Sequence, residues 1–233
     1  NIWAALNHGI SYIINNSAFN FYNESNGLKG SINDVVYFNN KLYVCTSLGI
    51  FVQNKHGNFE MLPGTKGDGR SFYKTEKYIY CSHFNGIFEI GINHVKNISP
   101  YKLTWRFAKL PNHKDLVIAS TRHYGFLLLQ IENERLFIKN RIKGFDHEVI
   151  FYTVDEYGDI WMSNTDKGLI RLQINESCDS ITKIDYYTDT NGLPKDKIVA
   201  PFLFKSQTNH PEIIYFTANS VYNFNRKTEK FTI

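Results

Sequence analysis

Short apolar and aromatic runs recur along the chain in pairs, and the two runs of a pair are separated by a polar turn that ends in a glycine in all but the last pair. Runs rich in Ile, Val, Tyr, Phe and Trp fit a pleated sheet, and a glycine in the turn supplies the positive φ that a tight hairpin often needs. No segment carries a sustained apolar stripe at helical spacing. The pattern therefore predicts an all-β chain of repeated hairpins. These hairpins span residues 1–13, 41–52, 78–90, 116–129, 159–172 and 212–224.

The hairpins recur at a nearly constant interval. Successive turn positions are separated by 40, 37, 39, 43 and 52 residues. These positions are Gly9, Gly49, Gly86, Gly125, Gly168 and Ser220. A period of about 40 residues is typical of one four-stranded blade of a β-propeller. We therefore expect a β-propeller of about six four-stranded antiparallel blades, with blade segments at about 1–30, 31–66, 67–101, 102–145, 146–194 and 195–233.

Further strand candidates lie between the hairpins, five that follow a hairpin and five that precede one. If strands are lettered A to D from the propeller axis outward, the hairpin supplies B and C, D follows it, and A precedes the next hairpin. The D candidates are 18–22, 59–62, 135–138, 181–187 and 230–233, and the A candidates are 32–38, 71–74, 103–108, 149–154 and 198–204. The chain opens on a B strand, so the first blade lacks its inner strand. Either a ring of six blades closes loosely, or the chain is a piece of a larger propeller, and the second alternative is favoured.

Composition narrows the function classes. Charged residues make up 21% and hydrophobic residues 42% of the 233 positions, which excludes an intrinsically disordered chain. There is no apolar run of about 18 residues, so we expect no membrane contact by this segment. A net charge of +4 without a basic block predicts no nucleic-acid partner. The chain starts at Asn1 without a signal peptide, so it is expected to begin inside a longer protein.

The three cysteines do not predict a disulfide framework or a metal centre, because their spacing fits neither. Cys45 and Cys81 lie in apolar strand candidates and are expected to be buried. Cys178 lies in a polar stretch and is expected to be exposed.

Several motifs resemble one known family. They are G-D-I-W-M-S-N-T-D-K-G-L-I-R-L at 158–172, N-G-L-P-K-D-K-I-V at 191–199, N-G-L-K-G-S-I-N-D-V-V at 26–36 and N-I-W-A-A-L-N-H-G-I-S-Y-I at 1–13. This pattern resembles the two-component regulator propeller repeat, in which Gly-Leu-Pro leads into strand A and an Ile/Leu-Trp strand runs to the turn glycine. The resemblance covers essentially the whole chain. It weakens in the third and fourth copies, where Tyr80 and Ile118 replace the tryptophan.

The resemblance implies a non-catalytic sensor domain. Such propellers form the periplasmic part of hybrid histidine kinases in gut Bacteroides-like bacteria, where they bind oligosaccharides. The implied partners are therefore an oligosaccharide, the remaining propeller and kinase parts of the full protein, and a second copy in a homodimer. Kinase activity would lie outside this chain, and neither a cofactor nor a metal is expected.

The B–C turns are the best candidates for ligand binding, because B–C turns and D–A loops project on the same face of a propeller around its axis. Aromatic rings there could stack on sugars, and Arg122 or Lys167 could pair with a uronate or sulfate. His8, His83 and His123 occupy equivalent turns, for which a zinc site is the less favoured alternative. The predicted ligand-binding residues are His8, His83, Phe84, Asn85, Trp105, Arg106, Arg122, His123, Tyr124, Asn164 and Lys167.

Two further segments have competing interpretations. The carboxylates Asp155, Glu156 and Asp159 could do acid/base work or bind a cation, but a structural A–B turn is favoured. The glycine-rich run 64–70 lacks the P-loop order, and a mobile D–A loop is expected there. A propeller enzyme, either a polysaccharide lyase or a hydrolase, and a protein-interaction scaffold remain the alternative functions, because fold alone does not choose between them.

Overall fold

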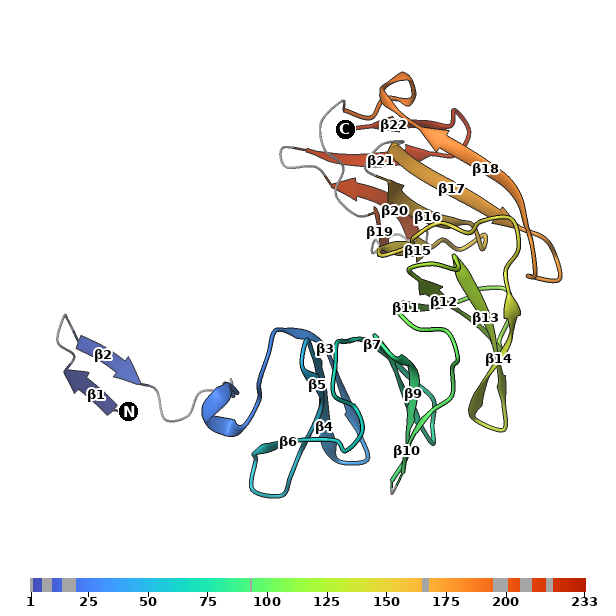
Figure 1. Cartoon of the computed structure of the whole chain (residues 1–233). Helices are drawn as coiled ribbons and strands as arrows, with labels where there is room; N and C mark the ends of the chain where they lie inside the picture. The colour runs from blue at the N-terminus through green and yellow to red at the C-terminus, as the bar shows by residue number, and fades with distance from the viewer. Residues whose placement is uncertain are drawn as a thin grey trace.

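The computed structural model places successive antiparallel sheets along an arc (Figure 1). It describes residues 2–5, 10–13, 20–92, 94–164, 168–194, 201–205, 211–216 and 220–233, with side chains described in 20–92, 94–163, 168–194 and 220–233. In this part of the chain there are five four-stranded sheets and one two-stranded sheet. We number them as blades 1 to 6 in chain order.

The strand bounds show one plan repeated from blade to blade. Blade 1 holds β1 (Ile2–Ala5) and β2 (Ile10–Ile13). Blade 2 holds β3 (Ile32–Phe38), β4 (Lys41–Thr46), β5 (Gly49–Gln53) and β6 (Phe59–Met61). Blade 3 holds β7 (Gly69–Lys74), β8 (Ile79–His83), β9 (Gly86–Ile90) and β10 (Val95–Asn97). Blade 4 holds β11 (Thr104–Lys109), β12 (Leu116–Thr121), β13 (Phe126–Glu132) and β14 (Arg135–Arg141). Blade 5 holds β15 (Tyr152–Val154), β16 (Ile160–Asn164), β17 (Gly168–Ile174) and β18 (Ile181–Tyr187). Blade 6 holds β19 (Pro201–Lys205), β20 (Pro211–Phe216), β21 (Val221–Asn225) and β22 (Lys230–Thr232).

Within blades 2 to 6 the strands pair in sequence order, and the first strands of neighbouring blades contact one another. This arrangement confirms the predicted propeller class, and in blades 2 to 6 the repeated hairpin lies in the middle of the blade. In these five blades the first strand is therefore the inner strand.

The core lies between blades rather than within one layer. Ile50 of blade 2 packs with Ile79 and Cys81 of blade 3, and the same arrangement recurs between later blades. Every residue of β8 and of β12 is buried, because both faces of these strands meet a neighbouring sheet. This burial explains why the second strand of a blade is apolar nearly throughout instead of alternating.

The repeated Asn-Gly-Leu motif forms the same structure in both of its copies. In each copy the asparagine is the last residue of a single 3₁₀ turn, η1 (Glu24–Asn26) or η2 (Asp189–Asn191). The glycine of the motif follows the turn and has a positive φ. A Cβ on Gly27 would lie 2.4 Å from the carbonyl oxygen of Phe59, and one on Gly192 would lie 2.3 Å from that of Phe231. The next residue, Leu28 in one copy and Leu193 in the other, is buried in the core. The motif therefore ties the segment before an inner strand to the outer strand of the same blade.

Three expectations were wrong. Residues 20–22 are not a strand, because the chain there runs into η1, whose first turn is capped by the side chain of Asn23. Residues 18–19 lie outside the described residues. The structure adds β10, a three-residue outer strand of blade 3 that the sequence pattern did not reveal. Cys178 is buried, because its turn packs against the A–B turn of blade 4, where the sulfur lies 3.3 Å from His113 Nε2.

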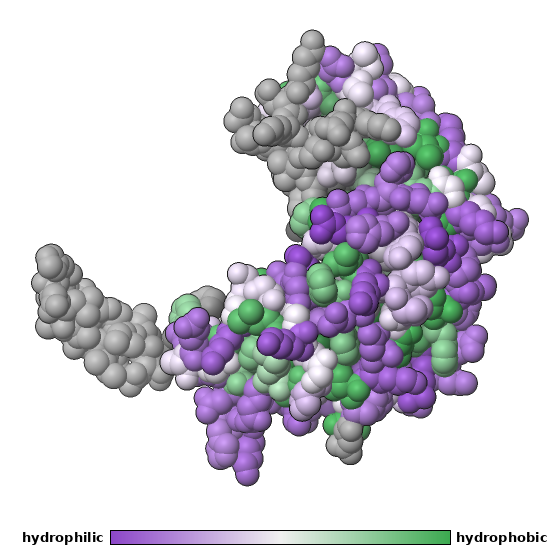
Figure 2. Space-filling view, in the orientation of Figure 1, coloured by the Kyte–Doolittle hydropathy of each residue, from purple (hydrophilic) through white to green (hydrophobic). Residues whose placement is uncertain are grey.

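The surface carries both polar and apolar side chains, and several of the exposed apolar ones lie on blade 2. Ile32, Val35 and Tyr37 on β3 are more than half exposed. Figure 2 shows green apolar surface among purple polar surface over blades 2 and 3. No helix long and apolar enough to cross a membrane occurs among the described residues.

Candidate functional site

The turns between the second and third strands lie beside the loops that lead into the inner strands, and main-chain hydrogen bonds join them. The Gly67 N–H donates to the Leu48 oxygen at 3.0 Å, and the Phe84 N–H donates to the Asp68 oxygen at 2.8 Å. We call this edge of blades 2 to 4 the rim, formed by residues 31–33, 46–49, 67–70, 83–86, 103–106 and 121–125. The hydrogen bonds fix the rim loops to one another across blade boundaries.

Leu103 joins two of these turns in the same way. Its N–H donates to the Phe84 oxygen at 2.8 Å, and its own oxygen accepts from the Arg122 N–H at 3.0 Å. Leu103 has a φ of 57°, a left-handed conformation that a bulky residue rarely adopts. The two main-chain hydrogen bonds hold Leu103 in this strained conformation. Strained residues held by their surroundings are common at functional sites.

A β-bulge opens the inner strand of each of these three blades. Pairing between inner and second strands shifts between Ile32 and Asp34, between Gly69 and Ser71, and between Thr104 and Phe107. The extra residue is Asn33 in blade 2 and Arg70 in blade 3, and in blade 4 the bulge contains Trp105 and Arg106. Bulges re-aim side chains and are common next to binding sites.

The bulged residues of one blade reach toward the next blade. Asn33 Nδ2 donates to the Gly69 oxygen at 2.6 Å and to Asp68 Oδ1 at 3.1 Å. Arg70 forms an ion pair with Asp68, and its guanidinium lies 3.9 Å from the centre of the Trp105 ring. The equivalent positions of three blades therefore form one continuous row.

The row continues into blade 5. The guanidinium of the exposed Arg106 lies 5.4 Å from the centre of the Phe151 ring, and Phe151 is 50% exposed. Trp105 is half-buried, and its Nε1 is a buried donor without a hydrogen-bond partner in the described part of the chain. We call Asn33, Asp68, Arg70, Trp105, Arg106 and Phe151 the inner row. It presents two cations, each against an aromatic face.

A second cluster lies on the turn of blade 4. Arg122 Nε is 2.9 Å from Glu148 Oε1, and both side chains are largely exposed. The Tyr124 ring stacks edge-on with that of Tyr101 at 5.3 Å, and the guanidinium of Arg141 lies 5.1 Å from the Tyr124 ring centre. The exposed His123 borders Tyr124, so this turn also offers cations beside aromatic rings.

The prediction for His83 was wrong. Its side chain is fully buried, and its ring packs edge-on against Phe88 at 4.9 Å. Nε2 lies 3.2 Å from the Thr65 oxygen, and Nδ1 accepts the Asn85 N–H at 3.0 Å. Burial lowers the pKa of His83, so the ring is neutral and is held in the core. The last residue of β8 points inward, and only the following Phe84 is exposed, at 51%.

The remaining predicted residues are Asn85, Asn164, His8 and Lys167, and the structure describes them to different extents. Asn85 is half-buried, and its carbonyl oxygen accepts from Asn97 Nδ2 at 2.8 Å. For Asn164 only the backbone position at the end of β16 is described. His8 and Lys167 lie outside the described residues. Among the described residues no cluster of three or more His, Cys, Asp or Glu side chains could hold a metal ion.

The carboxylates of the Asp155–Asp159 turn have structural partners. Asp155 Oδ1 accepts the Tyr157 and Asp159 N–H groups, each at 3.0 Å, and Oδ2 accepts Trp161 Nε1 at 2.8 Å and also binds Arg226. Asp159 Oδ2 accepts from Arg226 NH1 at 3.0 Å. These contacts join blade 5 to blade 6 and support the interpretation of the segment as a structural A–B turn.

The glycine-rich loop is fixed in place rather than mobile as expected. Thr65 is fully buried, and its hydroxyl donates to the Leu62 oxygen at 2.8 Å and accepts the Ile50 N–H at 3.2 Å. Arg70 of the inner row directly follows this anchored loop. Asn33, Asp68, Arg70 and Phe151 were not among the residues predicted from the sequence. Like Trp105, these residues lie just before an inner-strand candidate or near its start. That position is the sequence signal that could have identified them.

No family model and no curated protein matches the sequence. Among solved structures, the extracellular domain of a hybrid two-component system from B. thetaiotaomicron aligns with a TM-score of 0.65 and 14% identity over 91% of this chain and 31% of that one. A second hybrid two-component domain from the same organism has a TM-score of 0.56 and 15% identity over 82% of this chain and 26% of that one.

Virginiamycin B lyase from Staphylococcus aureus also aligns, with a TM-score of 0.54 and 14% identity over 87% of this chain and 69% of that one. The chain therefore spans less than a third of the two sensor domains and about two thirds of the lyase. Identities of this size establish a common fold. The chain shares its β-propeller architecture with the extracellular domains of Bacteroides two-component sensors.

Proposed function

We propose that this chain is a non-catalytic, ligand-sensing part of the periplasmic region of a hybrid two-component sensor histidine kinase. It binds an oligosaccharide at the rim, and the signal passes to a kinase outside the chain. Support comes from the likeness to the extracellular sensor domains, from the family-like motifs, and from the fixed rim that carries the inner row.

The observation that carries the proposal is the pairing of cations with aromatic faces along the inner row. Arg70 covers Trp105 and Arg106 lies over Phe151. Aromatic faces suit the apolar C–H faces of sugar rings, and guanidinium groups bind carboxylates and sulfates through charge-assisted hydrogen bonds. An oligosaccharide that bears uronate or sulfate groups matches both features.

Signalling then follows from differential affinity. A ligand that binds one arrangement of the sensor region more tightly than another shifts the population toward that arrangement, and the kinase responds to the shift. The rim is fixed by main-chain hydrogen bonds, so the ligand meets a preorganised surface, and little ordering cost opposes binding.

Isothermal titration of the purified chain with an oligogalacturonate and with a neutral cello-oligosaccharide tests the proposal. The acidic sugar is expected to bind, and Trp105→Ala or Arg106→Gln should weaken it about tenfold, while the thermal unfolding of each variant is followed in parallel. Arg135→Gln on the outer strand β14 serves as a matched control and should leave affinity unchanged.

The outcomes separate the alternatives. Turnover of an oligosaccharide by the purified chain would favour a lyase or hydrolase. Failure of every glycan to bind, together with tight binding of a protein, would favour the interaction scaffold. Equal affinity of the wild type and both inner-row variants would place the ligand elsewhere on the chain.

A further inference from the structure

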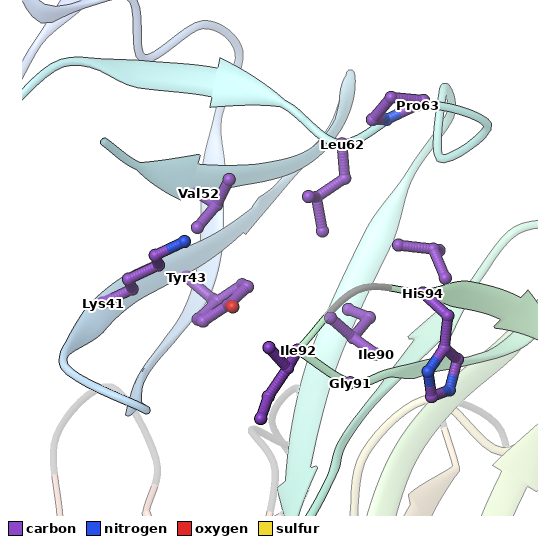
Figure 3. Close-up of a pocket in the computed structure, with 10 residues that line it drawn as sticks. Lys41, Tyr43, Val52, Leu62, Pro63, Ile90, Gly91, Ile92 and His94 are labelled. Atoms are coloured by element: carbon purple, nitrogen blue, oxygen red, sulfur yellow. The ribbon is translucent and has the colours of Figure 1, made fainter. Parts of the chain in front are cut away.

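A cavity of about 380 Å³ opens between blades 2 and 3, and no rim residue lines it (Figure 3). Val52 of β5 and Leu62 just after β6 form one wall, and Ile90 of β9 and Val95 of β10 form the other. The volume falls in the range typical of small-ligand sites, and the apolar walls favour an apolar body.

Two polar groups of β4 face this cavity. Lys41 and Tyr43 lie on the same side of the strand, and Figure 3 shows the Lys41 amino group directed toward the space beside Val52. Neither the ammonium nor the hydroxyl has a side-chain hydrogen bond or ion pair in the described part of the chain. Burial raises the pKa of Tyr43, which keeps its hydroxyl protonated and able to donate.

The opposite edge of the cavity supplies no competing charge. The His94 ring turns away from the cavity in Figure 3, and its Nε2 is 3.0 Å from Glu89 Oε1. Gly91 lies beside that ring, where a Cβ would come within 2.5 Å of it, and Ile92 extends the apolar edge. The lining residues include no carboxylate, so the cavity combines an apolar interior with two donors and no acidic side chain.

We propose that this inter-blade cavity binds a small amphipathic monocarboxylate. The aliphatic or aromatic body lies between Val52, Leu62 and Ile90, and the carboxylate accepts from the Lys41 ammonium and the Tyr43 hydroxyl. Charge-assisted hydrogen bonds of this kind are stronger than neutral ones, and the apolar walls exclude water from the ligand body. This site is distinct from the rim, so it can be tested independently of the oligosaccharide proposal.

Octanoate titrated into the purified chain is a direct probe, with octanamide as its uncharged counterpart. Octanoate should bind in a 1:1 complex, and octanamide should bind at least fivefold more weakly. Lys41→Gln should lower octanoate affinity about fivefold, because the ammonium is solvent-exposed and its interaction is partly screened. Lys41→Arg should restore most of it. Lys29→Gln, a charge removal in the segment before β3 and outside the cavity, serves as the matched control.

A second variant keeps the test independent of charge. Val52→Phe fills the cavity and should abolish octanoate binding, and the melting temperature shows whether the variant remains folded. Absence of saturable octanoate binding, equal affinity for octanamide, or unchanged binding by a folded Val52→Phe variant would each overturn the proposal. Equal losses in Lys41→Gln and Lys29→Gln would overturn the assignment of the carboxylate to Lys41.

Discussion

Replacing Asp155 by asparagine tests whether this turn carboxylate holds blades 5 and 6 together. Asp155 is 3% exposed, and the asparagine keeps one oxygen, which can still accept the Tyr157 and Asp159 N–H groups. In the wild-type protein, Trp161 Nε1 and Arg226 NH2 both donate to the second carboxylate oxygen. In the variant these two donors face the amide nitrogen, which is itself a donor. Both donors lose an acceptor, and the indole nitrogen belongs to a fully buried side chain.

The magnitude follows from these contacts. Breaking a fully buried ion pair costs about 3–5 kcal/mol. The Arg226 side chain is 33% exposed, so the loss of its ion pair with Asp155 should cost less than that. With an unsatisfied buried donor added at about 1–3 kcal/mol, the net loss should be about 3 kcal/mol. For a chain of this size, the melting temperature should fall by about 6–12 °C.

Denaturant unfolding and calorimetry of wild type, Asp155→Asn and Asp146→Asn provide the measurement. Asp146 pairs with Arg141 on the surface, where its side chain is 67% exposed, so that control should lose under about 1 kcal/mol. If Asp155→Asn lost no more stability than the control, the structural role would be refuted. Unchanged stability combined with lost ligand binding would indicate a functional role instead.

Three further predictions concern the core. Burial lowers the pKa of His83, so below about pH 6.5 the unfolded chain binds more protons than the folded chain, and stability should fall as the pH drops. Melting temperatures measured between about pH 7.5 and 5 should fall less steeply for His83→Gln than for wild type, and an equal slope would contradict the assignment. Gly125→Ala should cost about 3 kcal/mol or more in denaturant unfolding, because φ is 62° and a Cβ would lie 1.8 Å from the Phe145 oxygen. Gly57→Ala, with a φ of 84° but open space around it, should cost only about 1 kcal/mol, and equal losses would show that the contact is not decisive. All three cysteines are free and buried, so Ellman's reagent should react with them only after unfolding, whereas rapid labelling of the native chain would argue against their burial.

The blade plan could be predicted from the sequence because local signals carry it. Apolar runs, turn glycines and their spacing are all visible in one dimension, and each hairpin is a contact between neighbours in the chain. The errors fell where the local signal is weak. β10 spans only Val95–Asn97, and its sequence has too few apolar residues to mark a strand. Residues 20–22 carry the aromatic side chains of a strand but are followed by the capped turn η1.

The rim was harder to predict than the blades, because side-chain direction there depends on register. In the run His83-Phe84-Asn85 the sequence does not show which residue faces inward, and the histidine proved to be the buried one. Asn33 and Arg70 belong to the inner row only because a bulge shifts the pairing at the start of their strands. Such a shift is set by the neighbouring strand and blade, so hydropathy alone did not reveal it.

The main-chain hydrogen bonds of the rim separate the proposed ligand recognition from the architecture of the loops. Peptide groups of Asp68, Phe84 and Leu103 hold the loops together, and peptide groups are the same whatever residue carries them. Under the proposed function, substitutions at exposed positions such as Phe84 or Arg106 would therefore change ligand specificity while the loops keep their course. A combinatorial library restricted to these positions would sample new ligands on an unaltered framework.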